Sequence, residues 1–177
     1  MACDITLGRL EPCKDSVGGL KAVYFVNYDS TIAPLATVDA DGIITAFGSA
    51  ITLYKFDLKG TNNSFDEAGE TSRDNGTTFF TQTGTLVLKK QDAVTQKQLK
   101  LLSYGRPLVF VEDHNGNFRV AGLENGCEVT VGTASGAAMG DLSGYNVSFA
   151  GTEKGMASFV DAAIIGDTVN TTVVSGT

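Results

Sequence analysis

The only histidine of the chain, His114, stands beside Asp113 in the stretch VEDHNGNFRV. A carboxylate next to an imidazole could serve general-base chemistry or bind a metal ion. The chain has no second histidine to complete a two-histidine site, and HNGN has the composition of a tight turn between two strands. We therefore predict that His114 lies in a solvated hairpin turn.

The three cysteines, Cys3, Cys13 and Cys127, do not form a recognisable metal or redox motif. None belongs to a CxxC pair, and Cys3 and Cys13 are farther apart than the ligands of a zinc knuckle. An odd number of cysteines is more typical of a reducing compartment than of a disulfide framework. We expect reduced, partly buried thiols.

Other catalytic and phosphate-binding motifs are also missing from the sequence. There is no GxSxG nucleophile elbow, and the glycine-rich stretch 131–144 lacks the GK[ST] ending of a P-loop and precedes a strand. The sequence predicts no catalytic, cofactor-binding or metal-binding residues, no cofactor, and therefore a protein that is not an enzyme.

Length and charge limit the remaining classes of function. The 177 residues fit one domain, 1–177, and 13 Lys and Arg against 20 Asp and Glu give a formal net charge of −7. This balance excludes a basic grip on nucleic acid as the main function and argues against an anionic membrane as partner. No secretion signal and no apolar run approaching the roughly 18 residues of a membrane span are found, so we expect a folded protein made in a cytoplasm.

The chain is rich in signals for β-structure. Twenty-one glycines and the Asn-Gly steps at 75–76, 115–116 and 125–126 are typical of hairpin turns, and several segments between them alternate apolar and polar residues. The predicted strands are 21–27, 42–47, 49–58, 77–90, 108–113, 118–123, 127–133, 144–153 and, more weakly, 156–161.

One segment, 91–107, has a helical pattern instead. Asp92 can cap its amino end, Gly105 and Pro107 can stop it, and Val94, Leu101 and Leu102 fall in one apolar stripe. The predicted fold is mainly β: a sandwich or half-barrel of antiparallel strands with one flanking α-helix at about 92–104.

Residues 59–76, KGTNNSFDEAGETSRDNG, look like an unusually long loop or hairpin. Long loops in compact domains are often functional, although most acidic runs are only solvated faces. If the segment makes assembly contacts, we expect its larger and charged side chains to make them: Phe65, Asp66, Glu67, Glu70 and Arg73.

The C-terminal segment 161–177 admits two interpretations. It is either one more edge strand of the same molecule or an arm that completes its β-pairing on a neighbouring subunit. In the second case the contacts would come from Phe159, Ile164, Ile165 and Val169.

Four stretches together resemble virion structural proteins of tailed bacteriophages, most closely the tail tube (major tail) protein. They are MACDITLGRLEPCKDSVGGLKAVYFVNY, LYKFDLKGTNNSFDEAGETSRDNGTTFFTQTGTLVLKK, QKQLKLLSYGRPLVFVEDHNGNFRVAGLENGCEV and GAAMGDLSGYNVSFAGTEK, which cover most of residues 1–154. The long, threonine-rich end of this chain departs from the usual pattern of such proteins.

The resemblance implies a structural role in a virion tail, with assembly in the host cytoplasm. Copies would join into rings, commonly six-fold, that stack into a hollow tube, with other tail proteins at its ends and viral DNA passing through without specific binding. Residues 59–76 match by position the loop that reaches the next ring, and the end 161–177 suits a terminal arm. Neither the sequence nor the resemblance indicates which residues line the lumen.

The acidic charge agrees with such a conduit, because a negative wall repels phosphates and lets DNA slide. Two alternatives remain open. One is another phage structural module, such as a capsid decoration protein or a tail terminator, and the other is a non-catalytic β-sandwich binding module, which the absence of tryptophan makes less favourable.

Overall fold

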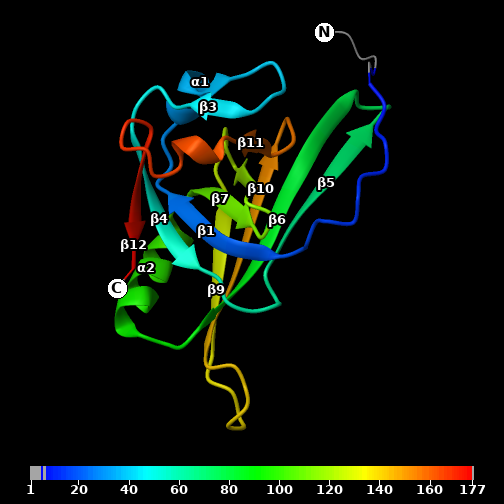
Figure 1. Cartoon of the computed structure of the whole chain (residues 1–177). Helices are drawn as coiled ribbons and strands as arrows, with labels where there is room; N and C mark the ends of the chain where they lie inside the picture. Colours follow the sequence, from blue (N-terminus) through cyan, green and yellow to red (C-terminus); the bar gives the residue numbers. More distant parts are fainter. Residues whose placement is uncertain (1–4, 6, 177) are drawn as a thin grey trace.

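The computed structural model describes Ile5 and residues 7–176, and it is mainly β, as the sequence predicts. Two sheets pack face to face with one long helix beside them (Figure 1). The larger sheet has the order β12-β4-β1-β7-β8-β11-β3-β2. Its strands are β1 (Leu20–Val26), β2 (Thr37–Val38), β3 (Ile44–Ala46), β4 (Ile51–Asp57), β7 (Leu108–Asp113), β8 (Phe118–Ala121), β11 (Ser158–Val160) and β12 (Thr171–Ser175).

The smaller sheet has four antiparallel strands in the order β5-β6-β10-β9. They are β5 (Ser64–Ser72), β6 (Thr77–Lys89), β9 (Glu128–Ala134) and β10 (Gly144–Glu153). The helices are α1 (Ile32–Leu35), α2 (Ala93–Tyr104) and the 3-10 turn η1 (Ala162–Ile164). The pairings between strands are antiparallel, as predicted, except at two places in the larger sheet, where β3 pairs with β11 and β4 with β12 in parallel.

The larger sheet is buried on both faces. In β1, Val23 and Phe25 face the smaller sheet, whereas Ala22, Tyr24 and Val26 belong to a second apolar cluster on the other face. That second cluster also includes Leu53 of β4 and Ile44 of β3, which lie near opposite ends of the strand order. The larger sheet therefore curls around a core of its own, and the smaller sheet packs on its outside, which agrees with the predicted sandwich or half-barrel.

Helix α2 begins and ends where the sequence predicts, but it buries a different face. The Asp92 carboxylate caps it by accepting a hydrogen bond from the Thr95 backbone N–H at 2.7 Å, and Gly105 follows its last residue. Leu99 is fully buried and Leu102 partly buried, whereas Val94 and Leu101 are exposed. The predicted stripe was therefore wrong, because the core lies on the side of Thr95, Leu99 and Leu102, which follow helical spacing.

Residues 59–76 are not the irregular loop that their composition favours. Residues 64–72 form strand β5, which pairs with β6 in unbroken register from Ser64 opposite Thr85 to Ser72 opposite Thr77. Together the two strands make a long hairpin that extends beyond the body of the molecule (Figure 1). The turn between them contains Gly76 at a φ of 63°, a conformation that glycine adopts without steric cost.

The C-terminal segment is an edge strand of the same molecule, which is the first of its two interpretations. After η1, β12 pairs in parallel with β4 from Thr171 opposite Ile51 to Ser175 opposite Lys55. The Thr171 hydroxyl is buried and donates to Ile164 O at 2.6 Å, while it accepts from Gly166 N at 2.7 Å. One edge of these strand residues is therefore already paired within the chain, and a contact of the segment with a neighbouring subunit stays a prediction.

Among the described residues, none of the helices has the length and apolar character needed to cross a membrane.

Candidate functional site

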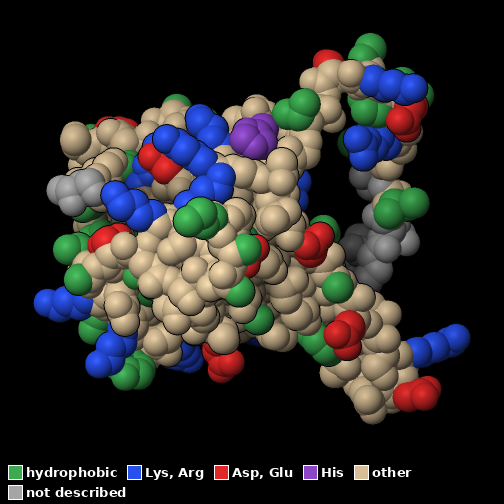
Figure 2. Space-filling model, turned by 90° about the horizontal axis from the view of Figure 1, so that it is seen from below, with side chains coloured by type: hydrophobic (Ala, Val, Ile, Leu, Met, Phe, Trp, Pro, Cys, Tyr) green, Lys and Arg blue, Asp and Glu red, His purple; other side chains and the backbone are tan. Residues whose placement is uncertain are grey.

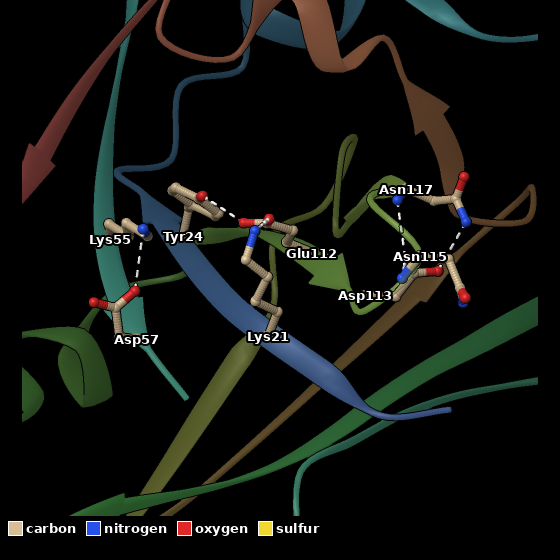
Figure 3. A network of polar contacts seen from close by, with 8 residues as sticks. All are labelled: Lys21, Tyr24, Lys55, Asp57, Glu112, Asp113, Asn115 and Asn117. Carbon is tan, nitrogen blue, oxygen red and sulfur yellow. Dashed lines mark hydrogen bonds and ion pairs between the residues drawn. The ribbon is translucent and has the colours of Figure 1, made fainter. Parts of the chain in front are cut away.

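The densest network of charged groups links β1 to β7 (Figure 3). The Glu112 carboxylate is buried and accepts from Lys21 Nζ at 2.5 Å and from the Tyr24 hydroxyl at 2.7 Å. Burial, and then the hydrogen bond to Glu112, raise the pKa of Tyr24 far above its ordinary 10.0, and Glu112 raises that of Lys21. Every charged group in this network has a partner, so it stabilises the sheet and holds no reactive group ready for a substrate.

His114 lies in the exposed turn between β7 and β8, as predicted. The neighbouring Asp113 carboxylate accepts from Asn115 N and Asn117 N, each at 2.8 Å, and from Asn117 Nδ2 at 2.9 Å (Figure 3). Partial burial opposes these hydrogen bonds, but the net result is a lowered pKa for Asp113. The carboxylate holds the turn together rather than orienting the imidazole.

The described cysteines do not meet one another. Cys127 is buried, and burial raises its pKa to about 12, which keeps the thiol protonated and unreactive. Cys13 is exposed, contrary to the expected partial burial, and Cys3 lies outside the described residues. Over the part of the chain that the structure describes, no three His, Cys, Asp or Glu side chains gather closely enough to hold a metal ion.

The best-formed hollow is an open crevice of about 340 Å³ between the start of β5 and the β7–β8 turn. It is lined by residues 17–20, residues 63–66, Val111, Asp113, Asn117 and Arg119. Asp113 is already engaged in its turn, and the Arg119 guanidinium stacks 4.6 Å from the centre of the Phe159 ring. The crevice thus offers a substrate few free polar groups that converge on one point.

The smaller sheet has a different kind of feature, two long unpaired edges. Among the described strands none pairs with the outer side of β5 or of β9. These strands have nine and seven residues, pair with their inner neighbours without a bulge, and contain neither lysine nor proline. Folded proteins usually blunt such edges, because an exposed strand readily pairs with another chain.

The two faces of the smaller sheet differ sharply. One face carries Phe65, Leu86, Val129, Val147 and Phe149 toward the larger sheet. The register places small hydroxyl side chains on the opposite face, listed here: Ser64, Ser72, Thr77, Thr81, Thr83, Thr85, Thr130, Ser148 and Thr152. The charged residues of that face are the acids Asp66, Glu70 and Glu128 and one base, Lys89. The face also carries Phe79 and Val87, and it is a hydroxyl-rich and net acidic surface.

The predicted assembly residues of 59–76 all lie on the β5–β6 hairpin, but they do not form one surface. Phe65 stacks on Phe149 with ring centroids 6.2 Å apart, so it belongs to the core. Glu67 is half-buried on the same inner face and accepts from Ala157 N at 2.7 Å. Asp66 and Glu70 are exposed on the outer face, and Arg73 is exposed at the turn.

The residues predicted to act in a C-terminal arm also differ in their exposure. Ile164 is buried and Ile165 partly buried in the core of the larger sheet, so both pack within their own chain, and their contact with a neighbouring subunit stays a prediction. Phe159 is partly exposed beneath Arg119, and Val169 is exposed in the turn before β12.

Two exposed segments were not among the assembly sites predicted from the sequence. Residues 7–19 form no helix or strand, residues 7–16 stand away from the body (Figure 2), and Leu7 and Leu10 are each at least 90% exposed. The loop 135–143, at the opposite end of the smaller sheet from the β5–β6 turn, presents a fully exposed Met139 (Figure 1). This loop is ordered by Asp141, which accepts from Ala137 N and Ala138 N, each at 2.8 Å. The sequence signal that could have indicated the first segment is the alternation of apolar residues near the N-terminus.

No protein-family profile matches the chain, and no curated protein or solved structure is significantly similar to it.

Proposed function

We propose that this chain is a self-assembling virion structural protein whose copies join into rings and stack into the tail tube of a tailed bacteriophage. The observation that carries the proposal is the pair of long, regular and unpaired edges on the smaller sheet. The larger sheet differs, because one of its edges, β2, has two residues and an irregular register. A short irregular edge resists pairing, whereas β5 and β9 favour it.

The strand directions allow these two edges to join. Because β5-β6-β10-β9 is antiparallel throughout, β9 of one copy runs antiparallel to β5 of a copy related to it by rotation about a common axis. The contact is heterologous, since β5 meets β9 and not itself, and repeated heterologous contacts close into rings or continue as helical stacks. Closure would remove every free edge of the smaller sheet.

The positions of the two edges suit a closed barrel with tilted strands. The middle of β5, Ala68, lies opposite Thr81 of β6. The middle of β9, Val131, lies opposite Val147 of β10, which in turn lies opposite Leu86 of β6. The offset between Thr81 and Leu86 is about five residues or 17 Å over three strand spacings, a tilt of about 50°. Closed barrels have tilts of roughly 35–45°, so the stagger between the edges is close to what closure requires.

In this arrangement the hydroxyl-rich face lines the lumen, because the other face of the sheet is covered by the larger sheet. Asp66, Glu70 and Glu128 give the wall a net negative charge against Lys89. Such a surface repels phosphates and forms no lasting ion pairs with them, so DNA passes without being held. We propose no catalytic step and no cofactor for the protein.

Stacking between rings would use the parts that project along the strand direction. These are the β5–β6 turn at one end of the smaller sheet and the loop with Met139 at the other (Figure 1). The N-terminal segment supplies further exposed apolar side chains, including Leu7 and Leu10. Exposed apolar groups gathered on projecting segments are typical of interaction sites. Other tail proteins would cover the ends of the tube.

The test is to purify the full chain and follow assembly by sedimentation and negative-stain microscopy over a range of concentrations and buffers. We expect rings or tubes, together with slower amide hydrogen exchange in β5 and β9 of the assembled fraction than of the monomer. A monomer at high concentration in every buffer would contradict the proposal. Single rings that never stack would instead favour a tail terminator or a decoration protein.

A further inference from the structure

The inner face of the smaller sheet changes from apolar to polar along its length. Near α2 it contributes Leu86, Tyr145 and Val147 to the core. Toward the β5–β6 turn, the inner positions include Glu67 and Gln82, which lie opposite each other in the register, and then Gly69, which lies opposite Phe80. The side-chain hydrogen bonds that attach this part of the hairpin to the rest of the molecule come from Glu67 and Gln82.

Gln82 is the more deeply buried of the two, with 1% of its surface exposed. Its Nε2 donates to Glu67 Oε1 at 3.2 Å and to Gly155 O at 3.4 Å, and its Oε1 accepts from Gly122 N at 2.9 Å. This one side chain thus joins β6 to β5, to the β10–β11 turn and to the residue that follows β8. Because a buried amide without partners is costly, only one orientation of the hairpin satisfies all these groups.

Glu67 attaches the edge strand itself. Its Oε1 accepts from the backbone N–H of Ala157, a buried residue just before β11, at 2.7 Å. A hydrogen bond to a carboxylate is stronger than one between neutral groups. Between residues 68 and 79, the described hydrogen bonds of the hairpin stay within the hairpin. The direction in which it projects is therefore set by the β6–β10 ladder, which ends at Phe80, together with the side-chain hydrogen bonds of Glu67 and Gln82.

We propose that Glu67 and Gln82 are positioning residues for self-assembly, which hold β5 in the orientation that the next copy must meet. The inference rests on the proposed function, because it assigns these residues a role in presenting the β5 edge. The sequence predicts that Glu67 contacts a neighbouring copy, whereas the proposal gives Glu67 a supporting role within its own chain.

Four variants of the full chain separate the effects of side-chain length, side-chain charge and position on the strand. Glu67→Ala removes the contact, Glu67→Asp keeps the charge but shortens the side chain, and Glu67→Gln keeps an oxygen at the same reach. Glu70→Ala is the matched control, since it removes a carboxylate from the same strand but on the outer face. The critical concentration for assembly, the denaturation midpoint and the hydrogen exchange of monomeric β5 would be measured for each.

We expect Glu67→Ala and Glu67→Asp to raise the critical concentration about tenfold and to speed exchange in β5, while Glu67→Gln stays near wild type. Glu70→Ala removes a repelling carboxylate from the lumen, so it should neither raise the critical concentration nor speed exchange in β5. Assembly of Glu67→Asp at the wild-type concentration would overturn the proposal, and so would impaired assembly with unchanged exchange in β5. If Glu67→Ala fails to fold, Glu67→Asp and Glu67→Gln decide the matter. Failure of the wild type to assemble would refute the proposed function, whereas the exchange data would still show whether Glu67 orients the hairpin.

Discussion

At the scale of single residues, the groups that could do chemistry serve the fold instead. Glu112 would be costly to bury alone, and Lys21 and Tyr24 together neutralise and solvate it. The Asp113 carboxylate is likewise saturated by the backbone of its turn. The sequence could indicate the turn around His114, because turn composition is local, but it could not indicate the Glu112 network, whose partners are about ninety residues apart.

The raised pKa of Tyr24 predicts that alkaline pH destabilises the protein. A group whose pKa is higher in the folded state contributes stability below its unfolded pKa and loses it as pH rises. For Tyr24 the loss begins near pH 10.0, and for Cys127 near pH 9.0, continuing to about 12. Between pH 10 and 11 the wild type should therefore lose about 1 kcal/mol more free energy of unfolding than Tyr24→Phe does. Denaturant unfolding at the two pH values measures this, and equal losses would contradict it.

At the scale of elements, local signals predicted β10 and α2 well, because Gly144–Glu153 alternates strictly and Asp92 caps its helix. β5 was not predicted as a strand, since its turn-forming and acidic residues resemble those of a loop, and it is stabilised by pairing with β6. The parallel pairing of β12 with β4 depends on contacts distant in sequence, which no local pattern encodes. The same holds for the open edges, because strand order is a property of the assembled sheet.

Gly84 allows β5, β6 and β10 to pack as they do. It lies between Phe65 and Phe149 in the register, and the two rings stack over it. A Cβ at this position would overlap the Phe149 ring. Gly84→Ala should therefore lower the free energy of unfolding by about 1–3 kcal/mol, as overpacking does. The control is Thr85→Ala on the exposed face, for which about 0.5 kcal/mol or less is expected. Equal stability of the two variants in denaturant titrations would argue against this packing.

At the scale of the whole molecule, a formal charge of −7 acts against association of identical copies. In the proposed ring, the acids Asp66, Glu70 and Glu128 of neighbouring copies face one lumen, where they repel each other. The energy of edge pairing has to exceed this repulsion, which depends on ionic strength.

Salt should therefore promote assembly. Raising ionic strength from about 10 to about 150 mM shortens the Debye length from about 30 to about 8 Å, which screens charges across the lumen. We expect the critical concentration measured by sedimentation to fall severalfold over this range. A rise instead would indicate that attractive ion pairs hold the copies together.

The stagger between β5 and β9 would affect the circumference of the proposed barrel. The circumference of a closed barrel follows from the number of its strands and their slip, so sliding β5 along β6 would select a wider or a narrower pore. Only even slips are compatible with the fold, because an odd one would turn Phe65 outward and Asp66 into the core. In the proposed tube, the width of the pore is thus adjustable only in discrete increments, each a slip of two residues between β5 and β6.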